Sequence, residues 1–263
     1  MPRGIVIEVD DPTDPRLFDF VELRDGRSPD GAFIVEGLTP LRELVRSLYS
    51  VRAVLVAHSK LAAVTPVLEG IDAPVYVGDL ALLRATVGYN LHRGVVASAQ
   101  RRQPAEPLSL ARNARRIAVL EQLNDVENLG NLFRSARAFG IEAVLLDPRT
   151  ADPLYRRCVR VSMGHVLHVP FARFERWPNA LDELRSLGFL VAALVPSGDM
   201  TLGEVRAERI AFLLGAEGAG LSAEAMERAD ARVRIPMVDV VDSLNVGTAA
   251  AIAFYEFDRD RLV

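Results

Sequence analysis

The segment Ile210-Ala-Phe-Leu-Leu-Gly-Ala-Glu-Gly-Ala-Gly-Leu-Ser222 contains five consecutive apolar residues followed by a glycine-rich turn. A short, uninterrupted apolar run is typical of a strand that is buried on both faces of a parallel sheet. Glycines allow the backbone that follows such a strand to approach a ligand closely. Because open α/β sheets bind their ligands beyond the carboxyl ends of the strands, we expect this turn to line a site.

Two further segments in the second half of the chain have the same character. Asn128-Leu-Gly-Asn-Leu-Phe-Arg134 opens a predicted helix after the apolar strand at 117–123. Ile235-Pro-Met237 ends another predicted strand, and Ser243-Leu-Asn-Val246 opens the last predicted helix. Each segment alone is explained by helix capping, for which Asn and Ser are common residues. The three in order predict one composite site, in which a buried Arg134 would bind an anion.

The chain of 263 residues alternates apolar strands with helices. This pattern predicts an α/β fold with a mostly parallel sheet that is covered by helices on both faces. We expect an acidic N-terminal extension at 1–30 with at most a short strand and a short helix, and a small α/β domain at 31–103. An arginine-rich stretch with two prolines predicts a linker at 104–114, followed by a larger α/β domain at 115–263.

The composition is that of a soluble globular protein, since half of the residues are hydrophobic and a quarter are charged. No apolar run reaches the roughly 18 residues that span a bilayer. The chain start lacks the basic and apolar regions of a secretion signal. A single cysteine, Cys158, excludes an internal disulfide and fits a reducing cytoplasm, where we expect the protein to act.

The basic residues are unevenly distributed, although the net charge is −4. The stretch 100–116 holds five arginines against one acid and is either a solvated segment or a surface that contacts phosphates. The candidates for nucleic-acid contact there are Arg101, Arg102, Arg112, Arg115 and Arg116. The chain has one lysine, Lys60, without the glycine pattern of a phosphate-binding P-loop.

The three segments together resemble the motifs of the SpoU family of RNA 2′-O-ribose methyltransferases, in the SPOUT superfamily. The motifs are Asn-x-Gly-Asn-x-x-Arg, Gly-x-Glu-Gly-x-Gly-Leu-Ser, and Ile-Pro-Met with Ser-Leu-Asn-Val. The resemblance covers about residues 31–257. Phe33-Ile-Val-Glu-Gly37 resembles the start of that family's L30e-like substrate-binding domain. One departure is Asp239, where the family often has a glycine.

The resemblance implies a C-terminal domain with a deep trefoil knot, an RNA-binding N-terminal domain, and a homodimer whose active site uses both subunits. It implies S-adenosylmethionine as the methyl donor, held by Leu214, Gly215, Glu217, Ile235, Met237, Leu244 and Asn245. It also implies a polar reaction centre of Asn128, Arg134, Glu217, Ser243 and Asn245. Arg134 would grip the RNA phosphate beside the reacting hydroxyl, because arginine is a poor base.

Several alternatives stay open at this point. A 23S-type ribosomal RNA is the favoured substrate, transfer RNA is the nearest variant, and a non-catalytic dimer that binds RNA and cofactor is a second class. A nucleotide-dependent oxidoreductase is disfavoured, because the glycine spacing differs from the dinucleotide fingerprint Gly-x-Gly-x-x-Gly. His165 lies directly before a predicted strand at 166–170, and His168 lies within it. Residues three apart on a strand face opposite ways, so we expect no metal site.

Overall fold

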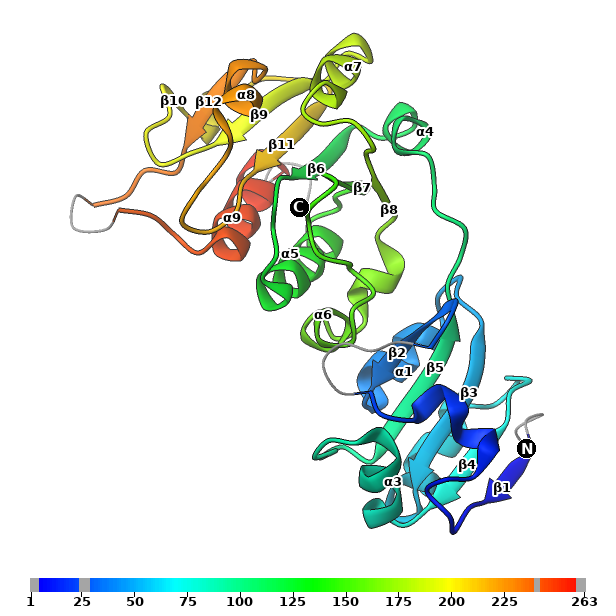
Figure 1. Ribbon diagram of the computed structural model, residues 1–263. Helices are drawn as coiled ribbons and strands as arrows, with labels where there is room; N and C mark the ends of the chain where they lie inside the picture. Colours follow the sequence, from blue (N-terminus) through cyan, green and yellow to red (C-terminus); the bar gives the residue numbers. More distant parts are fainter. Residues whose placement is uncertain (1–4, 24–28, 239–241, 259–263) are drawn as a thin grey trace. The chain divides into compact units, whose positions relative to one another are not determined.

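The computed structural model describes residues 5–23, 29–238 and 242–258. Within these ranges the chain forms helices and strands in alternation (Figure 1), in agreement with the predicted α/β class. None of the helices in this described part has the length and apolar character needed to cross a bilayer.

The chain divides into two compact units whose boundaries differ from the predicted ones. The first unit comprises residues 1–103 and 154–168, and the second comprises 104–153 and 169–263. Each unit has its own sheet. The chain therefore passes three times from one unit to the other, whereas the sequence pattern predicted a single passage through a linker.

The first unit contains a mixed five-stranded sheet in the order β1-β4-β3-β5-β2. β1, β4 and β3 run parallel, whereas β5 is antiparallel to both β3 and β2. The strands are β1 (Val6–Glu8), β2 (Ala32–Glu36), β3 (Val51–Ala57), β4 (Val75–Gly78) and β5 (Val95–Gln100). This domain is therefore α/β, with a mixed sheet.

Helices cover the first sheet on both faces. The 3-10 helix η1 (Pro15–Phe20) and α3 (Leu80–Val87) pack on one face through a continuous apolar cluster. Three further helices of this unit also contact strands of the sheet. They are α1 (Leu38–Val45), α2 (His58–Val64) with the 3-10 turn η3 (Thr65–Val67), and α6 (Arg156–Val161) with the 3-10 turn η4 (His165–His168).

The N-terminal segment is part of the first unit and not an extension. β1 pairs with β4, and Leu17 and Phe20 are fully buried. The Asp19 carboxylate is buried as well: it accepts a hydrogen bond from Ser98 Oγ at 2.7 Å and pairs with Arg52 at 3.0 Å. The acidic composition of this segment concealed its role, because a few apolar side chains and one paired acid are enough to dock it.

An ion pair holds α6 in the first unit. Arg156 Nη1 lies 3.0 Å from the buried Glu36 carboxylate, and its guanidinium lies 3.8 Å from the centre of the Tyr89 ring. Burial, with Glu36 beside the ring, raises the pKa of the Tyr89 hydroxyl. The strand predicted at 166–170 is wrong: residues 165–168 form η4, and the strand begins only at Phe171.

The second unit contains a seven-stranded parallel sheet in the order β10-β12-β9-β11-β6-β7-β8. The strands are β6 (Arg116–Leu120), β7 (Ala143–Leu146), β8 (Phe171–Arg173), β9 (Leu190–Leu194), β10 (Met200–Thr201), β11 (Ile210–Leu214) and β12 (Ala231–Arg234). Leu214 of β11 stands opposite Leu120 of β6. The two strands therefore end at the same edge of the sheet, and the predicted parallel sheet is confirmed.

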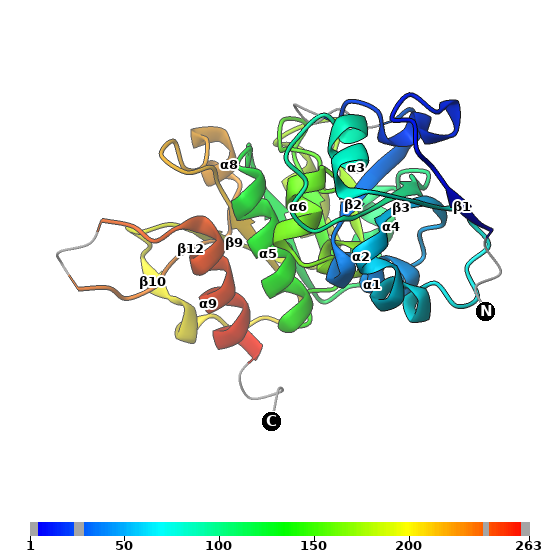
Figure 2. The same cartoon turned by 90° about the horizontal axis from the view of Figure 1, so that it is seen from below.

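Two helices cover one face of this sheet and three cover the other. α5 (Val126–Ala138) and α9 (Val246–Asp258) lie side by side, as Figures 1 and 2 both show. α4 (Pro107–Arg112), α7 (Ala180–Ser186) and α8 (Ala223–Glu227) pack into the apolar cluster of the opposite face, and a 3-10 turn η5 (Leu202–Glu204) follows β10. The trefoil knot implied by the resemblance stays a prediction.

The predicted linker at 104–114 is a structural part of the second unit. It contains α4, whose Ala111 is fully buried against the sheet, as is Ala114 just beyond it. Arg209 fixes this segment: its guanidinium donates to the carbonyls of Ala111 at 2.7 Å and Ala114 at 2.8 Å, and also to Leu187. The same group stacks on Phe189, with 4.3 Å to the ring centre.

Replacing Arg209 by alanine should destabilise the second unit. The substitution leaves four carbonyl groups, that of Arg112 included, without their charged donor, so we expect the free energy of unfolding to fall by about 3 kcal/mol. Urea unfolding followed by the fluorescence of Trp177, the single tryptophan, reports on this unit. Arg206→Ala is the control, because Arg206 bonds only carbonyls of its own exposed loop. Equal losses of stability in the two variants would contradict the role of Arg209 in fixing the segment that contains α4.

Candidate active site

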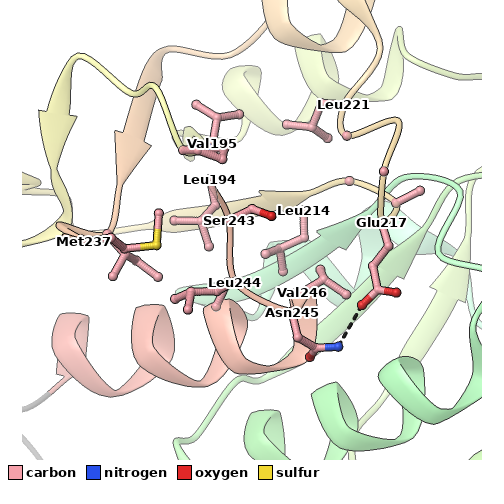
Figure 3. Close-up of a pocket in the computed structure, with 17 residues that line it drawn as sticks. Leu194, Val195, Leu214, Glu217, Leu221, Met237, Ser243, Leu244, Asn245 and Val246 are labelled. Carbon is pink, nitrogen blue, oxygen red and sulfur yellow. Dashed lines mark hydrogen bonds between the residues drawn. The ribbon is translucent and has the colours of Figure 1, made fainter. Parts of the chain in front are cut away.

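A cavity of about 460 Å³ lies at the carboxyl ends of β9, β11 and β12 (Figure 3). Its wall is formed by the glycine-rich turn after β11, by the segment after β12 and by the start of α9. It is lined by all seven residues predicted to hold a methyl donor: Leu214, Gly215, Glu217, Ile235, Met237, Leu244 and Asn245. Segments that are far apart in the sequence therefore meet at one cavity, as the composite-site hypothesis requires.

The wall of this cavity is mostly apolar and carries one charged side chain. Leu194, Leu214 and Leu244 point toward one another in Figure 3, with Met237 at one side. Among the described lining residues, Glu217 is the only ionisable one, and none is basic. Phosphate groups are usually bound by arginine, lysine or a free helix start. The lining has no basic side chain, and the first N–H groups of α9 already donate to Asn245, so this lining favours an uncharged or cationic ligand.

The glycine-rich turn closes on itself. Gly220 N donates to the Ala216 carbonyl at 3.0 Å, and the two residues form an isolated bridge. A Cβ atom on Gly215 would lie 2.4 Å from the carbonyl carbon of Gly220, so any other residue at position 215 would force the turn open. The turn is therefore a compact wall directly beyond β11.

A single side-chain amide joins the three predicted motifs. Asn245 Nδ2 donates to Asn128 Oδ1 at 2.7 Å and to Glu217 Oε1 at 2.7 Å, the second bond being drawn in Figure 3. Its Oδ1 accepts from the backbone N–H groups of Gly247 at 3.0 Å and Thr248 at 3.2 Å. Asn245 therefore caps α9 and simultaneously fixes the glycine-rich turn and α5.

Asn128 does not cap its helix. α5 begins at Val126, and its cap is Asp125, whose Oδ1 accepts from Glu127 N at 2.7 Å and from Asn128 N at 3.0 Å. The helix thus starts two residues before the predicted position. The Asn128 side chain is buried and is free to accept the hydrogen bond from Asn245.

The structure separates Arg134 from the other polar candidates. Arg134 lies on α5 beyond Asn128, is exposed, and has no hydrogen-bond or ion-pair partner in the described part of the chain. The expectation of a buried arginine is therefore wrong, and Arg134 is not among the described residues that line the cavity. Ser243 does line the cavity (Figure 3). Asp239 lies outside the described residues.

One buried carboxylate beneath the site was not predicted from the sequence. Glu121 follows β6 and is 1% exposed. Its Oε2 accepts from Ser222 N at 2.8 Å, and its Oε1 accepts from Ser222 Oγ at 2.7 Å and from Trp177 Nε1 at 2.6 Å. Ser222 ends the glycine-rich turn, so Glu121 anchors that turn to the sheet. An acid within an otherwise apolar strand pattern was the available signal.

The five arginines predicted to contact nucleic acid do not share one unit. Arg101 and Arg102 belong to the first unit, and Arg112, Arg115 and Arg116 belong to the second. Arg101 is half-buried and donates to the Ala32 carbonyl at 2.9 Å, and Arg116 is half-buried as well. The exposed members are Arg102, Arg112 and Arg115.

Metal binding has no structural support in the residues described. No group of three or more His, Cys, Asp or Glu side chains among them is arranged to hold an ion. His165 and His168 lie at the two ends of a 3-10 turn, and not on the strand from which their separation was argued. Cys158 is a buried free thiol.

Glu121→Ala should loosen the glycine-rich turn. It leaves the Ser222 N–H and hydroxyl and the Trp177 N–H without their acceptor, and each unsatisfied buried group costs about 1–3 kcal/mol. We expect amide hydrogen exchange in residues 215–222 to become faster by about tenfold or more. The control is Glu142→Ala, since Glu142 accepts from Arg115 N and Arg116 N at the opposite edge of the sheet. Unchanged exchange in the turn would refute the anchoring role.

Comparison with known proteins identifies the family of the chain. A model of the SpoU rRNA Methylase family matches residues 115–255. An uncharacterized tRNA/rRNA methyltransferase of Mycobacterium tuberculosis is 43% identical over 270 residues, which cover 98% of this chain and 94% of the relative. The crystal structure of an AdoMet-bound rRNA methyltransferase from Sinorhizobium meliloti has a TM-score of 0.81 at 26% identity, over 98% of this chain and 99% of that one. A crystal structure of an RNA 2′-O ribose methyltransferase has a TM-score of 0.78 at 26% identity, over 98% and 100%. The chain therefore belongs to the SpoU rRNA Methylase family and is an RNA methyltransferase of that family.

Proposed function

We propose that this protein methylates a ribose 2′-hydroxyl in structured RNA, with a 23S-type ribosomal RNA as the favoured substrate and S-adenosylmethionine as donor. The observation that carries the proposal is the convergence of three distant segments on one cavity, tied together by the Asn245 amide. The likeness to an RNA 2′-O ribose methyltransferase over the whole chain supports the reaction. The likeness to the AdoMet-bound rRNA methyltransferase structure from Sinorhizobium meliloti, over almost the whole of both chains, supports the RNA class.

The residues of the cavity fit this donor. S-adenosylmethionine carries an electrophilic methyl group on a positively charged sulfur, and its adenine ring has flat apolar faces. Leu214, Leu244 and Met237 give the apolar wall, and Glu217 gives one negative charge for the cation. A nicotinamide dinucleotide carries a pyrophosphate, for which the described lining offers no basic side chain. These features favour the methyl donor over the cofactor of an oxidoreductase.

The site residues would act mainly by positioning. Asn128, Glu217 and Asn245 hold one another in a hydrogen-bonded set, which fixes the turn against α9. Ser243 offers a hydroxyl on the same wall. Correct alignment of an acceptor hydroxyl with a donor carbon supplies up to about 7–11 kcal/mol of the barrier reduction in favourable cases. In this proposal, these residues contribute to catalysis by keeping the cavity wall rigid.

Arg134 would act from a second copy of the chain. It is exposed on α5 and is not among the described residues lining the cavity of its own chain. We propose a homodimer in which Arg134 reaches the partner subunit's cavity, grips the RNA phosphate there and orients the hydroxyl. The exposed apolar side chains of Ile252 and Tyr255 on the neighbouring α9 support an interface on this side of the domain.

The first unit would bind the RNA substrate, and the protein would act in the cytoplasm. Exposed Arg102 in this unit, and Arg112 and Arg115 in the other, offer cationic side chains for the RNA backbone. Arg101 has a smaller role in this proposal, because its Nε is already bonded to a carbonyl. Transfer RNA is the alternative substrate, since several relatives are named as tRNA/rRNA methyltransferases.

Arg134→Ala should abolish methylation without abolishing donor binding. Removing the guanidinium removes the phosphate contact and the orientation of the hydroxyl, so we expect turnover to fall about 100-fold or more. Calorimetric titration with S-adenosylmethionine should give a Kd close to that of the unaltered protein. Arg137→Ala, an exposed arginine one turn further along α5, is the matched control. Lost donor binding with residual turnover would refute this role.

The substrate is identified by comparing ribose methylation in two strains. Total RNA from a strain that lacks this protein should miss one 2′-O-methyl group that the parent carries in its large ribosomal RNA. Reintroducing the gene should restore that group, and the Arg134→Ala gene should not. A missing methyl group in transfer RNA alone would replace the ribosomal assignment, and no difference in either RNA would contradict the activity.

A further inference from the structure

A second cavity lies at the same edge of the second sheet as the donor cavity. It has a volume of about 580 Å³ and is formed beyond the carboxyl ends of β7 and β8. All seven strands of this sheet run parallel, so both cavities face the edge where the strands end. The volume is in the range of pockets that bind molecules of nucleotide size.

Two arginines of this cavity are available for a ligand. Arg149 and Arg176 both line it and are exposed, and neither has a hydrogen-bond or ion-pair partner for its guanidinium within the described ranges. Arg173 nearby is different, because it donates to the carbonyls of Asp147 at 2.6 Å and Ala151 at 3.3 Å. Two unpaired guanidinium forks on one cavity are suited to a phosphate group.

The backbone that carries Arg149 is held rigidly. Asp147 is fully buried, and its Oδ1 accepts from Gln122 N at 3.1 Å, Arg149 N at 3.2 Å and Thr150 N at 2.7 Å. These bonds fix the turn before a ligand arrives, which reduces the entropy lost on binding. Asp147 Oδ1 is thus committed to these N–H groups, whereas Oδ2 is buried without a hydrogen-bond partner in the described residues.

Trp177 supplies an aromatic wall next to these arginines. Its indole N–H donates inward to Glu121, and its ring packs against Phe174, with 6.4 Å between ring centres. The ring is half-buried and lines the cavity. Glu121 also binds Ser222 at the end of the glycine-rich turn, so one carboxylate is shared by the wall of this cavity and the wall of the donor cavity.

The exposed Glu175 narrows the class of ligand. It also lines the cavity, so the cavity is not a simple anion site. A carboxylate accepts hydrogen bonds from amino and imino groups, such as those on nucleobases. A nucleotide combines a phosphate for the arginines, a ring that stacks on Trp177 and base N–H groups for Glu175.

We propose that this cavity binds one unstacked nucleotide of the substrate RNA, next to the nucleotide that is methylated. The proposal rests on the proposed function, because it takes RNA as the substrate. Arg149 and Arg176 contact the phosphate, and Trp177 stacks on the base. The cavity thereby selects RNA in which the base next to the methylated nucleotide is unstacked.

Trp177 fluorescence tests this assignment directly, because Trp177 is the only tryptophan in the chain. The full-length protein is titrated with single-stranded RNA hexamers of one base each and, separately, with the four nucleoside monophosphates. We expect saturable quenching by at least one hexamer and a Kd at least tenfold weaker for the double variant R149A/R176A. R232A, an exposed arginine on β12, should bind as the unaltered protein does. No quenching by any hexamer, or equal affinity of the double variant, overturns the proposal. A monophosphate that binds as tightly as every hexamer also overturns it, in favour of a free-nucleotide site.

Methylation kinetics separate this proposal from the proposed function. With ribosomal RNA from the strain that lacks the protein, R149A/R176A should raise KM for RNA at least tenfold and leave kcat and the Kd of S-adenosylmethionine unchanged. Normal activity of the double variant with an unchanged KM for RNA contradicts nucleotide binding in this cavity and leaves the proposed function intact. Absence of methylation by the unaltered protein contradicts the proposed function, while the hexamer titration still decides whether the cavity binds RNA.

Discussion

The amide of Asn245 is the interaction on which the arrangement of the site depends. An asparagine side chain has two donor hydrogens and one acceptor oxygen, and here both ends are used. The nitrogen serves Asn128 and Glu217, and the oxygen serves the first backbone N–H groups of α9. An aspartate would keep the helix cap and lose both donated bonds. The residue types at positions 128, 217 and 245 are therefore coupled, because the side chains at 128 and 217 accept the hydrogen bonds that the Asn245 amide donates.

The parallel sheet makes this coupling possible. β6 and β11 are neighbours in register although about ninety residues separate them, so the turns that follow them emerge at one edge. The backbone N–H of Glu121 continues the ladder to Leu214, and the Glu121 carboxylate then reaches Ser222. The glycine-rich turn is thus fixed at its start by the sheet, at its end by a buried acid and in its middle by Asn245. A turn restrained at three points forms a wall without a large core behind it.

The sequence predicted the elements that depend on continuous apolar patterns and missed those that depend on single polar contacts. The strand at Val51–Ala57 and the strand ending at Leu214 follow directly from their apolar runs. α4 was assigned to a linker, because the one buried residue of this short helix is an alanine and its anchor, Arg209, lies almost a hundred residues away. Capping by Asn128 was the alternative explanation of its segment, and local pattern cannot show that Asp125 already occupies that role. Glu121 was overlooked for the same reason: its partners come from two distant loops.

The placement of charge separates the two ends of the proposed reaction. Of the 31 basic residues in the chain, none lines the described part of the donor cavity, whose single charge is that of Glu217. Arg134, Arg149 and Arg176 all lie outside that wall. The Glu217 carboxylate attracts a cation that is bound in the cavity, whereas the arginines outside the cavity attract the phosphates of RNA. In the proposed reaction these arginines, with Arg134 supplied by the partner subunit, would hold the phosphates at the mouth of the donor cavity, so that a ribose rather than a phosphate would face the methyl group.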